Sequence, residues 1–487
     1  MKNTFKKALV FILTLSMLSA SFSVLAYAAE NTVKNVVCTI YKDGATGRGF
    51  SWSTDSNSSS DVQIVKTSQY DKNFSKAKTY SGSASKYLGR YIHHVAVTSL
   101  KAGTEYTYRV GDAKKNIWSA KATFKTDNGD GKFSFITIAD VQASSKENFK
   151  QAYRTAKASL GKAPNAEFMI NLGDYVNDNN NEQWDLYFDT FKSINNSLTH
   201  VPVVGNHDGA LDGEVTGSLR SLRFKNMFCL DESMNQSLDG VYYSFDYGNA
   251  HFAVLNTNDM WPMSQAQRNW LKNDMSNSDA QWKIILAHRS LYSAGKNINK
   301  PDTVTMRQML IPLIDELGID MVYAGHDHMY LRTAPVSGDA KTQTKYVTEI
   351  YNGKSVKFAL NPEGTVYTIP STAGTKRYSV NEDAISPVLE VADKAFSTSK
   401  NGGCFCTTQI DGNKLIYKAY VVNDKTQKVT LVDQFAIKKT KVKETVSPTN
   451  LDNTVITSAI TAPINAAEAV AIMLVSYVKL LFQKIAK

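Results

Sequence analysis

The sequence has few cysteines, no second long apolar run and only a modest excess of one charge. Four cysteines among 487 residues are too few for a small scaffold held together by disulfides; they are Cys38, Cys229, Cys404 and Cys406. Apart from an N-terminal stretch, no segment reaches the roughly 18 uninterrupted apolar residues of a convincing membrane-spanning helix. The formal charge of +10 attracts anionic ligands in general. An excess of this size does not by itself indicate a nucleic-acid-binding protein.

The composition is that of a globular protein. Hydrophobic residues make up 43% of the chain and charged residues 21%, which excludes disorder as the main state and excludes a collagen-like fibre. At about 100–200 residues per domain, the length predicts two to four domains.

The N-terminus has the pattern of an export signal. Three lysines precede the apolar run Ala8–Leu18, and Ala26-Tyr27-Ala28 forms a small-x-small cleavage site. We therefore expect residues 1–28 to be a signal peptide and the mature chain to be secreted. The alternative is an uncleaved membrane anchor.

Residues 31–128 read as an all-β sandwich. Short alternating segments are separated by clusters of Gly, Ser, Asn and Asp, which favours antiparallel strands. The stretch Leu100–Val110 resembles the fibronectin type III corner, where a Leu packs inward and a Tyr ties the turn to the next strand.

Residues 132–437 change to an α/β pattern, in which apolar strands alternate with helical stretches. The expected strands are Phe133–Ala139, Phe168–Leu172, His200–Val204, His251–Asn256, Trp282–Ala287 and Asp320–Ala324. The expected helices are Glu147–Leu160, Glu182–Ile194, Gln265–Met275 and Thr303–Leu317. From about Gly364, strand-like pieces return, and we expect them to complete a second sheet of the same domain.

The C-terminal tail, residues 438–487, begins with a basic run and a polar linker. The segment Ala466–Phe482 is largely apolar but too short to span a membrane comfortably. We expect an amphipathic helix that lies on a membrane or cell-wall surface or docks on the protein; a spanning anchor is the alternative.

Five short polar motifs follow the expected strands of the α/β region, at the sheet edge where ligands gather in such folds. Four of the eight histidines fall in them. Oxygen and nitrogen donors without thiolate suit divalent or trivalent metals near phosphate and water. The motifs are Asp140-Val141-Gln142, Gly173-Asp174, Gly205-Asn206-His207-Asp208, Ala287-His288 and Gly325-His326-Asp327-His328.

With these motifs the chain resembles the calcineurin-like metallophosphoesterases, and more narrowly the purple acid phosphatase-like enzymes that carry a fibronectin-like domain in front. The resemblance implies a four-layer α/β sandwich of two mixed sheets with a two-metal centre at its edge. It implies a first metal held by Asp140, Asp174 and His328. Asp174 would bridge to a second metal, whose other ligands would be Asn206, His288 and His326.

Two positions depart from the family pattern. Where most calcineurin-like members have a His two places after the first Asp, this chain has Gln142, and where the purple enzymes have a Tyr, it has Asn177. We therefore expect no tyrosinate–iron(III) colour. The first metal is expected to take oxygen from Gln142, Asn177 or water, and both metals to be divalent ions such as Zn, Mn or Fe(II).

The function expected from this set is hydrolysis of a phosphorylated small molecule by water that two metal ions activate. His207 is the expected proton donor to the leaving group. Asp208 either orients His207 or caps a local turn. The primary expectation is an acid-phosphatase-like monoesterase; the alternatives are a phosphodiesterase or nucleotidase on the same centre, and a non-catalytic binding protein that retains the fold.

Overall fold

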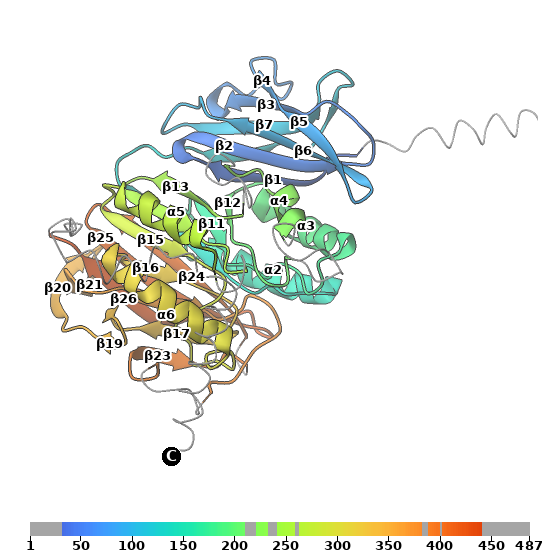
Figure 1. Cartoon of the computed structure of the whole chain (residues 1–487). Helices are drawn as coiled ribbons and strands as arrows, with labels where there is room; N and C mark the ends of the chain where they lie inside the picture. The colour runs from blue at the N-terminus through green and yellow to red at the C-terminus, as the bar shows by residue number, and fades with distance from the viewer. Residues whose placement is uncertain are drawn as a thin grey trace, which may run out of the picture.

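The structure, a computed structural model, describes residues 32–209, 221–231, 241–258, 263–381, 388–399 and 402–440. The expected signal peptide and the expected C-terminal helix lie outside these residues. Figure 1 shows a β-rich N-terminal part above a larger α/β part. The expected order of fold classes, an all-β sandwich and then an α/β sandwich, is confirmed.

The N-terminal part consists of two antiparallel sheets around an aromatic core. Phe50, Trp52 and Tyr108 are almost completely buried between them. The first sheet has the order β1 (Lys34–Tyr41), β2 (Asp43–Thr54), β6 (Arg90–Val97), β5 (Ser83–Tyr87). The second has the order β4 (Lys78–Ser81), β3 (Asp61–Lys66), β7 (Glu105–Asp112), with β8 (Ile117–Trp118) and β9 (Ala122–Lys125) both paired to β7.

The corner before β7 has the geometry that the sequence predicts. Leu100 is buried in the core of the sandwich. The hydroxyl of Tyr106 accepts a hydrogen bond of 3.0 Å from the backbone N–H of Lys101. The tyrosine therefore ties the preceding turn to its own strand.

The α/β part contains two mixed sheets. The first has the order β12 (Thr199–Pro202), β11 (Phe168–Asn171), β10 (Lys132–Ile138), β24 (Gly402–Asp411), β25 (Lys414–Asn423), β26 (Val429–Lys438), β21 (Lys354–Leu360), β20 (Lys345–Tyr351). The second has the order β13 (Tyr243–Tyr247), β14 (Ala250–Val254), β15 (Trp282–Leu286), β16 (Met321–Tyr323), β22 (Val366–Pro370), β17 (Tyr330–Thr333), β23 (Ala392–Phe396). Strands β10–β12 are parallel to each other, as are β14–β16 with β22.

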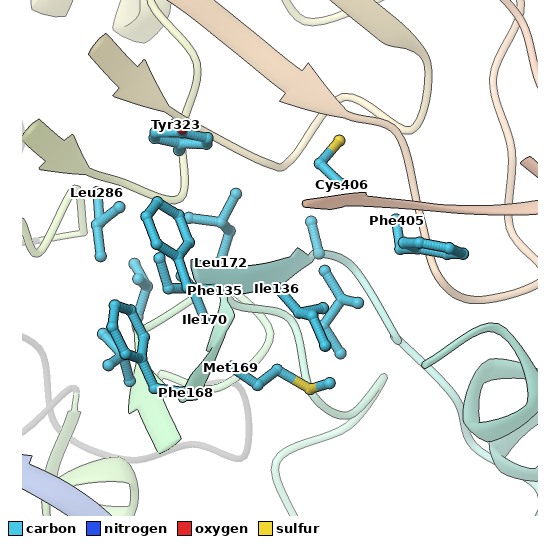
Figure 2. Close-up of a cluster of buried hydrophobic side chains, with 14 of the residues drawn as sticks. Phe135, Ile136, Phe168, Met169, Ile170, Leu172, Leu286, Tyr323, Phe405 and Cys406 are labelled. Atoms are coloured by element: carbon cyan, nitrogen blue, oxygen red, sulfur yellow. The ribbon is translucent and has the colours of Figure 1, made fainter. Parts of the chain in front are cut away.

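Aromatic side chains fill the space between these two sheets. The ring of Phe135 on β10 lies 5.9 Å from that of Tyr323 on the second sheet (Figure 2). The ring of Phe252, on the same sheet as Tyr323, lies 5.7 Å from that of Phe135. Burial of such rings is the main favourable contribution to this core.

Helices cover the two outer faces and complete the four layers. α2 (Lys146–Leu160) and α3 (Asn181–Asn195) pack on the first sheet, and α5 (Gln265–Ser276) and α6 (Pro301–Glu316) on the second. Ser145 and Asn180 begin α2 and α3 because their side chains accept a backbone N–H of the first turn. The remaining elements are the short helices η1 (Thr67–Gln69) and α4 (Leu222–Met227) and the hairpin of β18 (Val336–Ser337) and β19 (Ala340–Lys341).

The two parts of the chain share backbone and side-chain contacts. β1 pairs in parallel with β12 at Thr39 and His200. The hydroxyl of Ser51 donates to the carbonyl of Met227, the last residue of α4, at 2.7 Å. Arg90 on β6 forms an ion pair with Asp185 on α3. The sandwich is therefore joined to the same layer that carries part of the candidate site.

Candidate metal centre

The polar motifs meet at the carboxyl ends of the parallel strands. Two groups of possible metal ligands form there, with the donor atoms of each group all within 4.8 Å of one another. The first group consists of Asp140, Asp174 and His328, and the second of Asp174, His288 and His326. Because Asp174 belongs to both groups, its carboxylate lies where it can be shared between two cations.

In the first group, the carboxylate of Asp140 is completely buried and contacts both histidines of the loop that follows β16. Its Oδ1 lies 3.3 Å from Nε2 of His328. The same carboxylate accepts the backbone N–H of His326 at 3.0 and 3.1 Å. Asp140, which follows β10, thereby positions the loop that supplies both histidines.

Asn206 joins the second group. Nε2 of His288 lies 3.3 Å from Oδ1 of Asp174 and 3.0 Å from Oδ1 of Asn206. The structure thus brings a carboxylate, an amide oxygen and an imidazole to one point, with His326 beside them.

The imidazoles are oriented by backbone carbonyls. Nδ1 of His288 donates to the carbonyl of Leu172 at 2.8 Å, and Nδ1 of His328 donates to that of Lys376. These bonds leave Nε2 facing the carboxylates, as outer contacts do at metal sites. Nε2 of His326 is buried without a hydrogen-bond partner. A buried ring nitrogen without a partner, among carboxylates and an amide oxygen, fits metal ions.

The charges of these side chains depend strongly on each other. Burial raises the pKa of Asp174, but the imidazole of His288 outweighs burial and holds that pKa below its usual range. Burial lowers the pKa of His288, but Asp174 raises it to about 9. Burial and the neighbouring His288 hold the pKa of His326 well below its usual value, which keeps this ring in the neutral form that binds metal.

The backbone is strained at four site residues. Asp140, Gln142, Asp174 and His326 have φ values of 52°, 34°, 54° and 71°, in the left-handed region that costs free energy for residues other than glycine. Gly205 makes room for this geometry, because a Cβ there would lie 2.1 Å from the backbone nitrogen of Asp174.

Gln142 and Asn177, the two departures from the family pattern, both contact His207. Nε2 of Gln142 donates to Nε2 of His207 at 2.6 Å, and the backbone carbonyl of Asn177 accepts from Nδ1 of His207 at 2.6 Å. Oε1 of Gln142 is buried without a partner. Metal ligation by either amide remains a prediction.

Asp208 organises the backbone of the site. Its carboxylate accepts the N–H groups of Gly205, Asp174 and Tyr175, each at 2.8 Å. Burial, followed by repulsion from Asp174, raises its pKa to about 7. No hydrogen bond joins Asp208 to His207 in the described structure. Of the two roles considered for Asp208, these contacts favour the local turn.

Tyr378 is a site residue that the sequence analysis did not identify. Its ring stacks on that of His328, with the centroids 4.4 Å apart and the planes 13° apart. Its backbone N–H donates to the carbonyl of His328 at 3.0 Å. Tyr378 lies in no motif and 50 positions further along the chain, so no local pattern signals it.

Two parts of the chain match known families. Residues 33–126 match the purple acid phosphatase N-terminal domain, and residues 133–330 match the calcineurin-like phosphoesterases. All six ligands expected from the sequence lie within the second match.

Several curated proteins are similar over much of the chain. "Purple acid phosphatase" of Glycine max is 23% identical over 69% of this chain and 74% of its own length. "Probable inactive purple acid phosphatase 1" of Arabidopsis thaliana is 28% identical over 50% of this chain, and the match spans only 44% of that relative. "Acid phosphatase type 7" of Danio rerio is 23% identical over 74% of this chain and 81% of its own length.

A solved structure shares the fold. The purple acid phosphatase PPD1 from yellow lupin (Lupinus luteus) superposes with a TM-score of 0.69 at 18% identity, covering 84% of this chain and 75% of that chain. The likeness extends over both the β-sandwich and the α/β part.

Proposed function

We propose that this protein, which joins a purple acid phosphatase N-terminal domain to a calcineurin-like phosphoesterase domain, is an exported phosphomonoesterase that uses two metal ions. The observation that carries the proposal is the pair of ligand groups that share Asp174. Asp140, Asp174 and His328 would hold one ion, and Asp174, Asn206, His288 and His326 the other.

The chain's own residues supply the rest of the chemistry. When bound, two metal ions neutralise phosphoryl oxygens and acidify a water molecule. The backbone N–H of His207 donates to Oδ1 of Asp174 at 2.8 Å, which holds the backbone of His207 beside the shared carboxylate. The ring of His207 is held by the side chain of Gln142 and the backbone carbonyl of Asn177. His207 would carry a second proton on Nε2 and give it to the departing oxygen of an ester.

Two alternatives are a phosphodiesterase or nucleotidase on the same centre, and a binding protein without turnover. The word "inactive" in the name of the Arabidopsis relative favours the binding protein, and so does Gln142, which stands where most members of the family have a His. The presence of Asp174, Asn206, His288, His326 and His328 together favours catalysis. Hydrolysis of p-nitrophenyl phosphate and of bis(p-nitrophenyl) phosphate, after loading with Zn, Mn or Fe, separates the three functions. Turnover of the monoester alone is the expected result, and no turnover of either ester contradicts the proposal.

Export is part of the proposal and follows from the N-terminal sequence pattern. Among the helices of the described residues, none combines the length and the apolarity that a membrane crossing requires. The C-terminal segment remains the proposed contact with a membrane or cell-wall surface. N-terminal sequencing of the mature protein tests the cleavage after Ala28.

A further inference from the structure

The second sheet of the β-sandwich carries a row of rings and cations on its outer surface. Figure 1 shows β3, β4 and β7 of this sheet on the side that points away from the α/β part, whereas β1 of the other sheet pairs with β12. We call the outer surface of β4, β3, β7 and β8 the distal face. It faces away from the candidate metal centre.

Arg109 of β7 lies at the middle of this row. Its Cζ lies 4.4 Å from the centre of the Phe74 ring and 4.5 Å from that of the Trp118 ring. On the neighbouring strand, Oε1 of Gln63 accepts the Nε–H of Arg109 at 2.8 Å. Two rings and one amide therefore hold the guanidinium in one position, which lowers the entropy that it loses when it binds a ligand.

The row continues to a tyrosine and a lysine. The rings of Tyr70 and Phe74 lie 5.1 Å apart, edge to face. Nζ of Lys121 lies 4.7 Å from the centre of the Tyr70 ring. Tyr70 and Trp118 are half-buried, and Lys121 is exposed. The distal face therefore offers two accessible aromatic rings with a cation beside each.

The guanidinium of Arg109 has donors left for a ligand. In the described structure, its Nη1 and Nη2 groups donate to no protein atom, and no carboxylate forms an ion pair with it. The chain around it is described without a gap from residue 32 to residue 209. Residues 61–81 and 105–125, which form this sheet and its loops, hold nine Lys or Arg and four Asp or Glu. This excess of five positive charges favours an anionic ligand.

We propose that the distal face binds an acidic polysaccharide. The accessible parts of Trp118 and Tyr70 would contact the C–H faces of sugar rings, whose slight positive charge fits the negative face of an aromatic ring. Arg109 would hold a carboxylate of the polymer with its two terminal NH₂ groups, in the planar geometry that guanidinium favours. An open sheet surface with several anchors suits a polymer better than a small ligand, which needs a concave site.

The choice of a polysaccharide over a nucleic acid rests on the proposed export, because an exported protein meets the sugar polymers of the cell surface. The binding itself does not depend on the metal centre. A protein without phosphatase activity would leave this inference intact, and a protein that binds no polymer would leave the proposed hydrolysis intact.

The test measures binding of the full chain, without its expected signal peptide, to immobilised polygalacturonate by biolayer interferometry. The salt concentration is about 0.15 M, where exposed charges more than roughly 8 Å apart are screened. Three other polymers are compared. Neutral galactan offers sugar rings without carboxylates, polyphosphate offers negative charge without rings, and a single-stranded thymidine oligonucleotide offers both phosphate and bases.

Polygalacturonate should bind most tightly of the four polymers. Arg109→Gln and Trp118→Ala should each weaken this binding roughly 10-fold, through the loss of a charged hydrogen bond and of a stacking surface. Arg109→Lys should restore it only in part, because an ammonium group lacks the planar fork. The control is Lys357→Gln, which removes a positive charge from a similar contact 4.2 Å from the ring of Tyr346 in the α/β part. It should change the affinity less than about twofold.

Thermal unfolding of each variant shows whether a loss of binding reflects a damaged sandwich. If Trp118→Ala lowers the unfolding temperature, Lys121→Gln decides in its place, since Lys121 is exposed. This variant should weaken binding about two- to threefold.

Three outcomes overturn the inference. The first is that the wild type does not bind polygalacturonate. The second is an equal loss for Arg109→Gln and Lys357→Gln, which would show attraction by net charge alone. The third is tighter binding of polyphosphate or of the oligonucleotide that depends on Arg109, which would assign the distal face to a phosphate polymer or a nucleic acid.

Discussion

The side-chain amide of Gln142 donates a hydrogen bond to Nε2 of His207 across 2.6 Å. Because Nδ1 of His207 donates to the carbonyl of Asn177, the two contacts together select the tautomer with its proton on Nδ1. Oε1 of Gln142 has no partner. If the side-chain amide of Gln142 rotated by half a turn, Oε1 would face Nε2 of His207. Gln142 can therefore donate a hydrogen bond to Nε2 when that nitrogen carries no proton, and accept one when it does.

The contact between Gln142 and His207 predicts the effect of removing the amide. Gln142→Leu should keep two equivalents of metal and lower the turnover of an alkyl phosphate about five- to tenfold, the value of one hydrogen bond. Elemental analysis and kcat on ethyl phosphate provide the check. Loss of metal would instead make Gln142 a ligand of the first ion.

The shared carboxylate predicts a joint loss of metal and activity. Asp174→Asn should abolish both, because two cations at close range repel each other without an anion between them. Asp178→Asn, an exposed position four residues further on, is the control and should keep both metals. Two bound equivalents and near-normal turnover in the Asp174→Asn protein would rule out a binuclear centre.

His207 should separate chemistry from metal binding. His207→Ala should retain the metals, because Asn206 is the proposed ligand, and should slow turnover roughly 10²–10⁴-fold. The loss should be larger for alkyl phosphates than for p-nitrophenyl phosphate, whose leaving group needs no proton. An equal loss on both would show that His207 orients the phosphate.

A second histidine predicts a pH dependence of stability. Nδ1 of His251 lies 2.7 Å from Asp246, and Nε2 lies 2.8 Å from Asp274. Burial opposes the charged ring, but the two carboxylates raise the pKa of His251 to about 9. Since this value lies above that of the unfolded chain, the stabilisation is complete below about pH 6.5 and is lost as the pH rises through 9.

Urea unfolding at pH 6 and pH 10 measures this effect. The wild type should lose roughly 2–3 kcal/mol more than His251→Gln between the two values, a figure reduced for screening at the exposed Asp246. Equal losses in both proteins would show that the two ion pairs contribute nothing to stability.

The strands and the positions of the candidate ligands at their ends were predictable because their signals are local. The apolar runs that form β10, β11 and β15 end in glycine or polar residues, and the observed bounds fall within a residue or two of the expected ones. The convergence of Asp140 and Asp174 then follows from the rule that the parallel strands of one sheet end at one edge, because β10 and β11 are parallel neighbours. His288 follows β15 of the second sheet, and its approach to Asp174 depends on how the two sheets pack.

Other features were not predictable, because they depend on loops. The stacking of Tyr378 on His328 joins segments 50 positions apart, and the left-handed backbone at Asp140 and Asp174 arises from the surrounding packing. The partners of Gln142 likewise come from two different loops. Periodicity and spacing carry no information on such contacts.

The junction between the two parts limits how the gene can be divided for expression. Thr39 and Ser51 of the sandwich donate hydrogen bonds to the carbonyls of Cys229 and Met227, and β1 covers the free edge of β12. If the chain were cut between residues 126 and 133, the C-terminal fragment would expose the edge of β12 and would lose the sandwich's hydrogen bonds to residues 221–231. An exposed strand edge is prone to pair with other chains. Shortened chains made for crystallisation or enzyme engineering should therefore begin ahead of β1.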